Sequence, residues 1–140
     1  MKVLLDTCVI SEIAHPKGTK RVRERVATLR SVDTFLSVVT IGEITNGIAR
    51  LARGRKRKAL EAFLLHLEQD FESRILGVDL EAARIWGETT AAARQHGKTV
   101  PPTDGLIAAT AIRHGLHIMS RNVSDFEGTG ARIINPWDDA

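Results

Sequence analysis

Cysteine and aromatic residues are scarce in this sequence. Cys8 is its one cysteine, tyrosine is absent, and aromatic residues make up 4% of the 140 residues. A single cysteine excludes a disulfide within the chain and cannot build a zinc site by itself. With so few rings, we expect no base-stacking platform of the kind found in single-strand-binding proteins. Any contact with nucleic acid should therefore be made mainly with phosphates.

Long hydrophobic runs are also missing. No apolar stretch approaches the roughly 20 residues that a membrane helix needs, and the apolar stretch within residues 1–6 is too short for a signal peptide. We therefore expect a cytoplasmic protein with no membrane contact. Hydrophobic residues at 43% and charged residues at 26% are ordinary for a globular chain. The length suits a single domain over residues 1–140.

Positive charge is concentrated in one short segment. Lysine and arginine number 20 against 17 acidic residues, so the formal net charge is only +3. The segment from 50 to 58 contains the basic residues Arg50, Arg53, Arg55, Lys56, Arg57 and Lys58. Such a cluster suits a polyanionic partner, although a solvated helix face is the commoner explanation.

Short apolar segments alternate with amphipathic ones along the whole chain. The apolar segments predict strands at about residues 2–6, 34–38, 74–78, 117–120 and 132–134. Helical periodicity between them predicts helices at about residues 7–14, 19–31, 40–53, 60–71, 79–96 and 102–115. Strands that alternate with helices through short loops predict an α/β fold, with a mainly parallel sheet covered by helices.

Residues 40–72 are predicted to form a helical hairpin that projects from the main body. Thr40 and Glu43 match the capping box that opens a helix, and Gly54 fits the C-terminal cap of the same helix. An apolar stripe over residues 60–71 predicts a second helix that packs back against the first. The basic cluster would then straddle the turn of the hairpin.

Three acids stand at the ends of predicted buried elements. Asp6 ends the first apolar run, Glu43 lies in the first turn of the hairpin, and Asp104 lies in the first turn of an apolar helix. Taken singly, each acid is sufficiently explained as a helix cap or a complement to a helix dipole. In parallel sheets, however, ligands bind beyond the C-terminal ends of the strands. All three acids, and the loop at 121–125, fall at that edge.

Carboxylates that converge in this way predict a metal site. They repel one another and stay ionised only beside a cation. Oxygen ligands without histidine or thiolate favour Mg²⁺ or Mn²⁺ over zinc, and such an ion can promote phosphodiester cleavage. Nucleotide hydrolysis is less attractive, because the chain has no Gly-rich phosphate loop with a lysine. A cysteine phosphatase built on Cys8 would need arginine where the chain has Ala14.

Four sequence blocks make the chain recognisable: Leu-Leu-Asp-Thr-Cys-Val-Ile-Ser-Glu at 4–12, Thr-Ile-Gly-Glu at 40–43, Asp-Gly-Leu-Ile-Ala-Ala-Thr-Ala at 104–111 and Ser-Arg-Asn-Val-Ser-Asp-Phe at 120–126. In this order and spacing they resemble a PIN-domain protein, with the greatest likeness to VapC toxins of type II toxin–antitoxin systems, including the FitB-like branch. The likeness extends to Ile-Asn-Pro-Trp at 134–137.

The resemblance implies a three-layer α/β/α sandwich and a Mg²⁺- or Mn²⁺-dependent endoribonuclease that hydrolyses RNA phosphodiester bonds. It also implies a VapB-type antitoxin that silences the nuclease, a homodimer, and further assembly with the antitoxin on operator DNA. An antitoxin would block the site by adding an arginine or lysine to the acidic pocket, in competition with metal.

Residue by residue, Asp6, Glu43 and Asp104 match the family's three acidic ligands. Asp6 and Asp104 are expected to bind the main ion, and Glu43 to bind it or to orient the attacking water. Asn122 stands where FitB-like members can carry aspartate, and Asp125 lies three residues further on. These two residues are expected to complete the shell of the site.

Several residues that are not acidic are also expected to lie at the site. Cys8 departs from the family, which usually has asparagine after Asp-Thr, so we expect some rearrangement near Asp6. A hydroxyl from Thr7 or Ser120 could hold a carboxylate or a water, or could contact the substrate phosphate. Arg121 is placed to neutralise that phosphate, with a surface salt bridge as an equal alternative.

Two other functions stay open at this point. One is a nuclease-inactive PIN-fold module that binds RNA or serves only in an operator complex, which Asn122 and Cys8 keep possible. The other is a structure-specific DNA nuclease of the related flap family, whose members carry more acids and extra helical elements than this short chain can accommodate.

Overall fold

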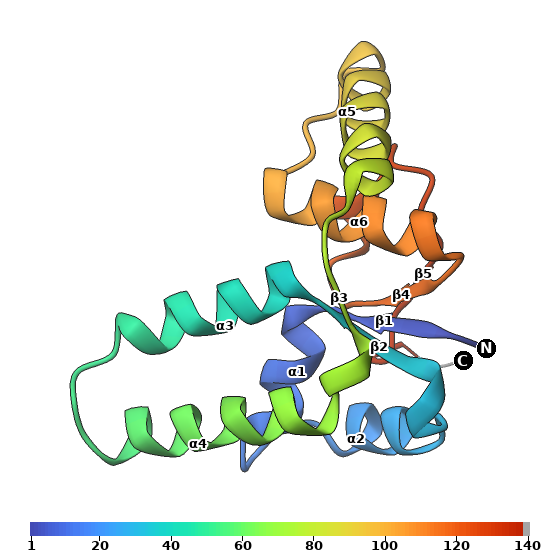
Figure 1. Cartoon of the computed structure of the whole chain (residues 1–140). Helices are drawn as coiled ribbons and strands as arrows, with labels where there is room; N and C mark the ends of the chain where they lie inside the picture. Colours follow the sequence, from blue (N-terminus) through green and yellow to red (C-terminus); the bar gives the residue numbers. More distant parts are fainter. Residues whose placement is uncertain (139–140) are drawn as a thin grey trace.

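A five-stranded parallel sheet forms the centre of the molecule (Figure 1). The structure is a computed structural model and describes residues 1–138. The strands lie in the order β3-β2-β1-β4-β5. Their bounds are β1 (Val3–Leu5), β2 (Thr34–Ser37), β3 (Ile75–Leu76), β4 (His117–Met119) and β5 (Ile133–Ile134). Every strand is shorter than the sequence predicts, and β3 keeps only two of the five expected residues.

Within residues 1–138, six α-helices accompany the sheet: α1 (Thr7–Ala14), α2 (Lys20–Ala27), α3 (Val38–Ala49), α4 (Arg55–Asp70), α5 (Leu80–Gln95) and α6 (Pro102–His114). Three short 3₁₀ turns complete the chain: η1 (Ser31–Asp33), η2 (Glu72–Arg74) and η3 (Val123–Phe126). No helix within residues 1–138 combines the length and the apolar character that a membrane span requires.

The central strand β1 shows why the fold has three layers. Successive side chains of a strand point to opposite faces of the sheet. Val3 and Leu5 accordingly lie in one core with apolar residues of α1, α2 and α4, whereas Leu4 lies in a second core with apolar residues of α6. All three residues are almost completely buried. The predicted three-layer α/β/α sandwich is therefore confirmed, and all of its strand pairs are parallel.

Helices α3 and α4 form an antiparallel hairpin that extends to one side of the sheet (Figure 1). The predicted capping box at its start is wrong. Helix α3 begins at Val38, directly after β2, and Ser37 is its N-cap, whose hydroxyl accepts a 3.0 Å hydrogen bond from Val39 N. Thr40 is consequently a fully buried residue inside the helix. The cap moves upstream because the strand leads into the helix without a loop.

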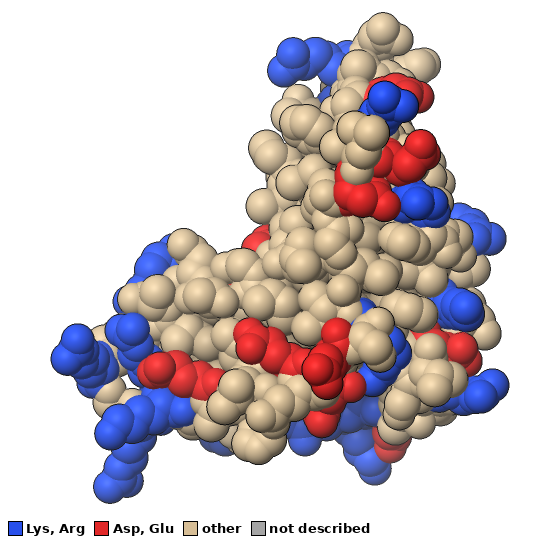
Figure 2. Space-filling view, in the orientation of Figure 1, with Lys and Arg blue, Asp and Glu red and all other residues tan. Residues whose placement is uncertain are grey.

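The turn of the hairpin also differs from the prediction. Gly54 is the N-cap of α4 and not the C-terminal cap of α3, which ends at Ala49 with Arg50 as its C-cap. The basic cluster therefore spans the turn and the first turn of α4. Figure 2 shows these lysine and arginine side chains gathered at the far end of the hairpin.

Other predicted boundaries can be compared directly with the structure. Helix α2 ends at Ala27, four residues early, and the Thr28 hydroxyl donates to the Arg25 carbonyl in a local bond that competes with further helix. Asp79 caps α5 as predicted, by accepting a 2.8 Å bond from Ala82 N. Gly115 ends α6 as predicted, in the left-handed conformation at φ 66°.

Candidate active site

Asp6 is the most firmly held acid of the predicted site. It follows β1 and caps α1, with Oδ1 accepting a 2.8 Å hydrogen bond from Thr7 N. Its other oxygen, Oδ2, accepts a 2.7 Å bond from Ser120 Oγ at the end of β4. Because its side chain is 4% exposed and each oxygen has a donor, the carboxylate has a defined orientation at the edge of the sheet.

Glu43 reaches the same edge from α3. The Thr7 hydroxyl donates a 2.6 Å hydrogen bond to Glu43 Oε1, and the buried Thr40 oxygen lies 3.3 Å from the Thr7 oxygen. Thr7 thus links the two acids, since its backbone N–H holds Asp6 and its side chain holds Glu43. Thr40 was missed by the sequence argument, which assigned it to a helix cap.

Asp104 lies in the first turn of α6 and is partly buried. Its pKa is raised from the ordinary 3.8 to about 6, mainly by burial and in addition by the negative charges of Asp6, Asp125 and Glu43. A carboxylate in the first turn of a helix ordinarily gains from the helix dipole. The raised pKa therefore means that burial and like charge outweigh that gain, and that the other three acids face Asp104 closely enough to oppose its ionisation.

Gly105 permits the close approach of α5 to α6 beside this acid. A Cβ at Gly105 would lie 2.9 Å from Cδ1 and 3.0 Å from Nε1 of Trp86, and 3.1 Å from Cγ2 of Thr90. Real Cβ atoms essentially never show a contact shorter than 3.0 Å, and the other two distances are tighter than most, so a side chain at this position would force its neighbours to shift. The glycine that follows Asp104 therefore helps to set where this carboxylate stands.

The predicted residues after β4 are placed in two different ways. Asp125 lies in η3 and its charge acts on Asp104. Asn122 joins the site through its backbone, since its N–H donates a 3.0 Å bond to Ser120 Oγ and its carbonyl accepts a 3.1 Å bond from Asp125 N. The Asn122 side chain is exposed.

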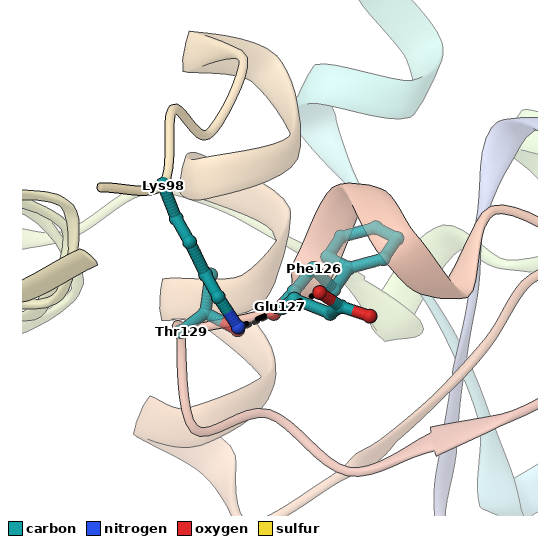
Figure 3. Close-up of polar contacts among 4 residues, drawn as sticks. All are labelled: Lys98, Phe126, Glu127 and Thr129. Carbon is teal, nitrogen blue, oxygen red and sulfur yellow. Dashed lines mark hydrogen bonds and ion pairs between the residues drawn. The ribbon is translucent and has the colours of Figure 1, made fainter. Parts of the chain in front are cut away.

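An ion pair between Lys98 and Glu127 connects the segment after η3 to the loop between α5 and α6 (Figure 3). Lys98 Nζ lies 3.4 Å from Glu127 Oε2, and the buried Thr129 hydroxyl donates a 2.6 Å bond to the Phe126 carbonyl. Gly128 lies between them in the left-handed conformation at φ 85°. Phe126 itself is buried in the core against α6.

Cys8 takes part in the hydrogen bonding around Asp6. Its thiol lies 3.7 Å from Asp6 Oδ2 and 3.5 Å from Ser120 Oγ, and it accepts a 3.4 Å bond from Arg121 N. Burial is the main reason why the pKa of the thiol lies above its usual value. The thiol is therefore a neutral and weak connector between α1 and the loop after β4.

The chemistry of these side chains fits a hard divalent cation. The charges of Asp6, Glu43 and Asp125 act on the carboxyl group of Asp104, and within residues 1–138 none of these four acids forms an ion pair with lysine, arginine or histidine. A cation would relieve the repulsion that raises the pKa of Asp104. In the same part of the chain, no three His, Cys, Asp or Glu side chains are already arranged to hold an ion. Binding would therefore draw the carboxylates closer together.

The chain is similar to known proteins over nearly its whole length. The PIN domain family model matches residues 3–129. Toxin FitB of Neisseria gonorrhoeae is 37% identical and is covered over 99% of its length by 98% of this chain. VapC ribonuclease Y4jK of Sinorhizobium fredii is 34% identical, with 99% of both chains covered. The solved structure of FitAB bound to an IR36 DNA fragment superposes with a TM-score of 0.92 at 34% identity, over 99% of this chain and 97% of the other.

Proposed function

The chain belongs to the PIN-domain family, and we propose that it is the toxin of a type II toxin–antitoxin system that cuts RNA with the help of a divalent ion, Mg²⁺ or Mn²⁺. The observation that carries the proposal is Asp104. Its carboxylate stands among those of Asp6, Glu43 and Asp125 with its pKa raised to about 6. Relatives named as ribonucleases or toxins support the same reaction.

We assign the ion to Asp6 and Asp104, with Glu43 either binding it or orienting the attacking water. When bound, the ion would polarise the scissile phosphate and favour ionisation of that water. The remaining work belongs to the chain. Thr7 and Ser120 hold the two carboxylates of Asp6 and Glu43 in defined orientations through bonds of 2.6 to 2.8 Å. Charge-assisted bonds of this kind preorganise the oxygens before substrate arrives.

The remaining predicted site residues receive more peripheral roles. Asp125 and Asn122 would complete the shell around the ion. Of the three predicted phosphate contacts, Thr7 and Ser120 donate their hydroxyl protons to carboxylates. Arg121 is therefore the residue to which we assign the substrate phosphate, since it is exposed and its guanidinium forms no ion pair within residues 1–138.

An antitoxin partner is consistent with the groove beside the acids. This groove of about 770 Å³ runs between α1 and the α3–α4 hairpin, and it includes Thr7 and Glu43 as well as Arg55 and Lys56 from the basic cluster. Its apolar lining suits an amphipathic segment. The lining comprises Ile10, Ala14, Ile44, Ile48, Leu51, Ala59, Leu60 and Phe63. We infer that a VapB-type antitoxin lies here and brings a basic side chain to Glu43, within a homodimer that assembles on operator DNA.

The nuclease assignment is tested by metal-dependent cleavage of RNA by the purified chain. Wild type should cleave in Mg²⁺ or Mn²⁺ and stop in a chelator. Asp6→Asn and Asp104→Asn should each lose activity by at least about a hundredfold, the scale of removing a group that stabilises transition-state charge. Glu88→Gln, which changes an exposed acid on α5, is the matched control.

The opposite result would favour the rival function. If Asp6→Asn and Asp104→Asn cleave as well as wild type, or if wild type binds RNA without cutting it in either metal, the chain is a PIN-fold binding module without nuclease activity. Expression in a bacterial host gives a second readout, because growth arrest should be lost in the same two variants.

A further inference from the structure

The guanidinium of Arg121 lies over the ring of Trp137, with Cζ 5.3 Å from the ring centroid. This distance is within the range of a cation–π interaction, for which tryptophan is the best acceptor among the aromatic residues. Trp137 belongs to the closing Ile-Asn-Pro-Trp motif, to which the nuclease mechanism assigns no role. The sequence argument linked Arg121 to a phosphate or to a surface salt bridge, and it did not foresee the tryptophan.

Trp137 is held firmly enough to fix the arginine. Its backbone N–H donates a 2.9 Å bond to Asn135 Oδ1, and its carbonyl accepts a 3.0 Å bond from Arg21 Nη1 on α2. The preceding Pro136 is buried. The indole packs against the apolar core beneath α1, α2 and α4. One face of this ring therefore has a set position before any ligand binds.

The sheet places this pair beside the acids. Strand β5 runs parallel to β4, and Ser120 N donates a 3.0 Å bond to the Ile134 carbonyl, so the chain after β5 runs alongside the loop after β4. In that loop, Ser120 Oγ donates to Asp6 and the next residue, Arg121, donates its N–H to Cys8 Sγ at 3.4 Å. Arg121 is thus anchored at the carboxylate cluster through its backbone, while its guanidinium stacks on Trp137.

The charge of Arg121 acts on the Glu12 carboxylate of α1, whose pKa it helps to lower, but the two side chains form no close ion pair. Across residues 1–138 no acidic oxygen lies within ion-pairing distance of its guanidinium, so the predicted alternative of a surface salt bridge is not formed. Stacking on a ring occupies one face of a guanidinium and leaves its N–H groups, which lie in the plane, available. A phosphate can bind these N–H groups in a bidentate manner without displacing the tryptophan.

We propose that Trp137 is a positioning residue of the nuclease: it holds the Arg121 guanidinium at the rim of the carboxylate cluster, where Arg121 binds a phosphate of the RNA beside the one that is cut. The proposal rests on the proposed ribonuclease function. It assigns to the C-terminal motif a task in substrate binding that the acids cannot perform, because an unneutralised phosphodiester would be repelled by four carboxylates.

The test is steady-state cleavage of one labelled single-stranded RNA by full-length variants in Mn²⁺. Arg121→Ala should raise KM. It should also reduce the slope of log KM against log salt concentration by about one, the change expected for the loss of one phosphate contact. Trp137→Leu, which keeps apolar volume but removes the ring, should raise KM by about two- to fivefold, the strength of an exposed cation–π contact. Trp137→Phe keeps a ring face and should recover most of the loss, with kcat following wild type more closely than KM does.

A double-mutant cycle shows whether Trp137 acts through Arg121. In the Arg121→Ala background, Trp137→Leu should raise KM no further. The proposal is overturned if Trp137→Leu raises KM equally in both backgrounds, if it lowers only kcat, or if phenylalanine behaves like leucine. Melting temperatures of all variants identify loss of folding, and the Arg121→Ala and Trp137→Phe results still decide the question if Trp137→Leu fails to fold.

Failure of the nuclease assignment gives a different pattern. In that case wild type leaves the RNA intact. If instead wild type cleaves the RNA and Trp137→Leu has an unchanged KM, only the proposed role of the tryptophan is contradicted. Binding of the same RNA to Asp104→Asn, followed by fluorescence anisotropy without turnover, gives an independent measure of the Arg121 and Trp137 effects.

Discussion

The hydroxyl of Thr7 donates a 2.6 Å hydrogen bond to the carboxylate of Glu43, which lies 36 positions away in the chain. This bond joins the first turn of α1 to the second turn of α3. Because Thr7 N also donates to Asp6, one residue orients two acids of the site. The relative placement of Asp6 and Glu43 thus depends on a small neutral side chain between them.

Thr7→Val should lower kcat while the fold is maintained. Valine has nearly the shape of threonine but cannot donate to Glu43, and a hydrogen bond to a charged group contributes about 1.5–3 kcal/mol, so we expect kcat to fall by at least about tenfold. Thr7→Ser keeps the donor and should remain within a few-fold of wild type. Single-turnover cleavage with saturating enzyme separates this effect from substrate binding. Equal activity in the valine variant would show that Glu43 needs no such orientation.

Ser120→Ala should destabilise the protein. The fully buried Ser120 hydroxyl donates to Asp6 Oδ2 and accepts from Asn122 N. Its loss leaves a buried carboxylate oxygen without its strongest donor, which costs about 1–3 kcal/mol. Urea unfolding at constant pH measures the change, and Ser124→Ala at an exposed position is the control. A stability within about 0.5 kcal/mol of wild type would contradict the predicted dependence on this bond.

The stability of the metal-free protein should fall as pH rises through about 6. The pKa of Asp104 is raised from the ordinary 3.8 to about 6 in the folded state, so the folded protein binds this proton more tightly than the unfolded chain does. The resulting stability is complete below the ordinary pKa and is lost as pH rises through the folded pKa. With a discount for solvent screening of this partly exposed group, we expect a loss of about 1–2 kcal/mol.

Thermal unfolding in a chelator, at about pH 5 and about pH 7.5, measures this effect. Asp104→Asn should abolish the difference and be more stable than wild type at the higher pH, because the amide carries no charge. Mn²⁺ should stabilise wild type at the higher pH by mass action and leave the Asn variant nearly unchanged. A wild type that gains stability between the two pH values in the chelator would contradict the assignment to Asp104.

Gly105→Ala should damage both stability and activity. The added methyl group would lie 2.9 Å from the indole of Trp86, so the indole or one of the two helices must shift, at a cost of about 1–3 kcal/mol. The shift would also move the adjacent Asp104 and lower kcat. Gly87→Ala is the matched control, because it lies in α5 with nothing within 4 Å of its Cβ position and should stabilise that helix by up to about 1 kcal/mol. Calorimetry of both variants, with their cleavage rates, decides the comparison.

The misplaced start of α3 shows what cap patterns can and cannot predict. Thr40, Glu43 and Gly54 have the residue types of helix caps, yet Ser37 caps α3 and Gly54 precedes α4. A cap pattern indicates which residues could form hydrogen bonds with the unpaired backbone N–H groups at the start of a helix. They do not report where a buried strand ends, and the end of β2 at Ser37 sets the start of α3.

By itself the sequence determined the alternation of strands and helices, and therefore the layered sheet, because periodicity and breaking residues act over a few positions. It also predicted that Asp6, Glu43 and Asp104 lie towards one edge of a parallel sheet, although Glu43 proves to stand in the second turn of α3 and not in the first turn of a helix. Only the tertiary structure decided that Thr7 serves two acids, that burial and three other carboxylates raise the pKa of Asp104, and that Arg121 stacks on Trp137. Most of these relationships are contacts between side chains that are far apart in the sequence. The packing of the helices on the sheet decides which of these side chains meet.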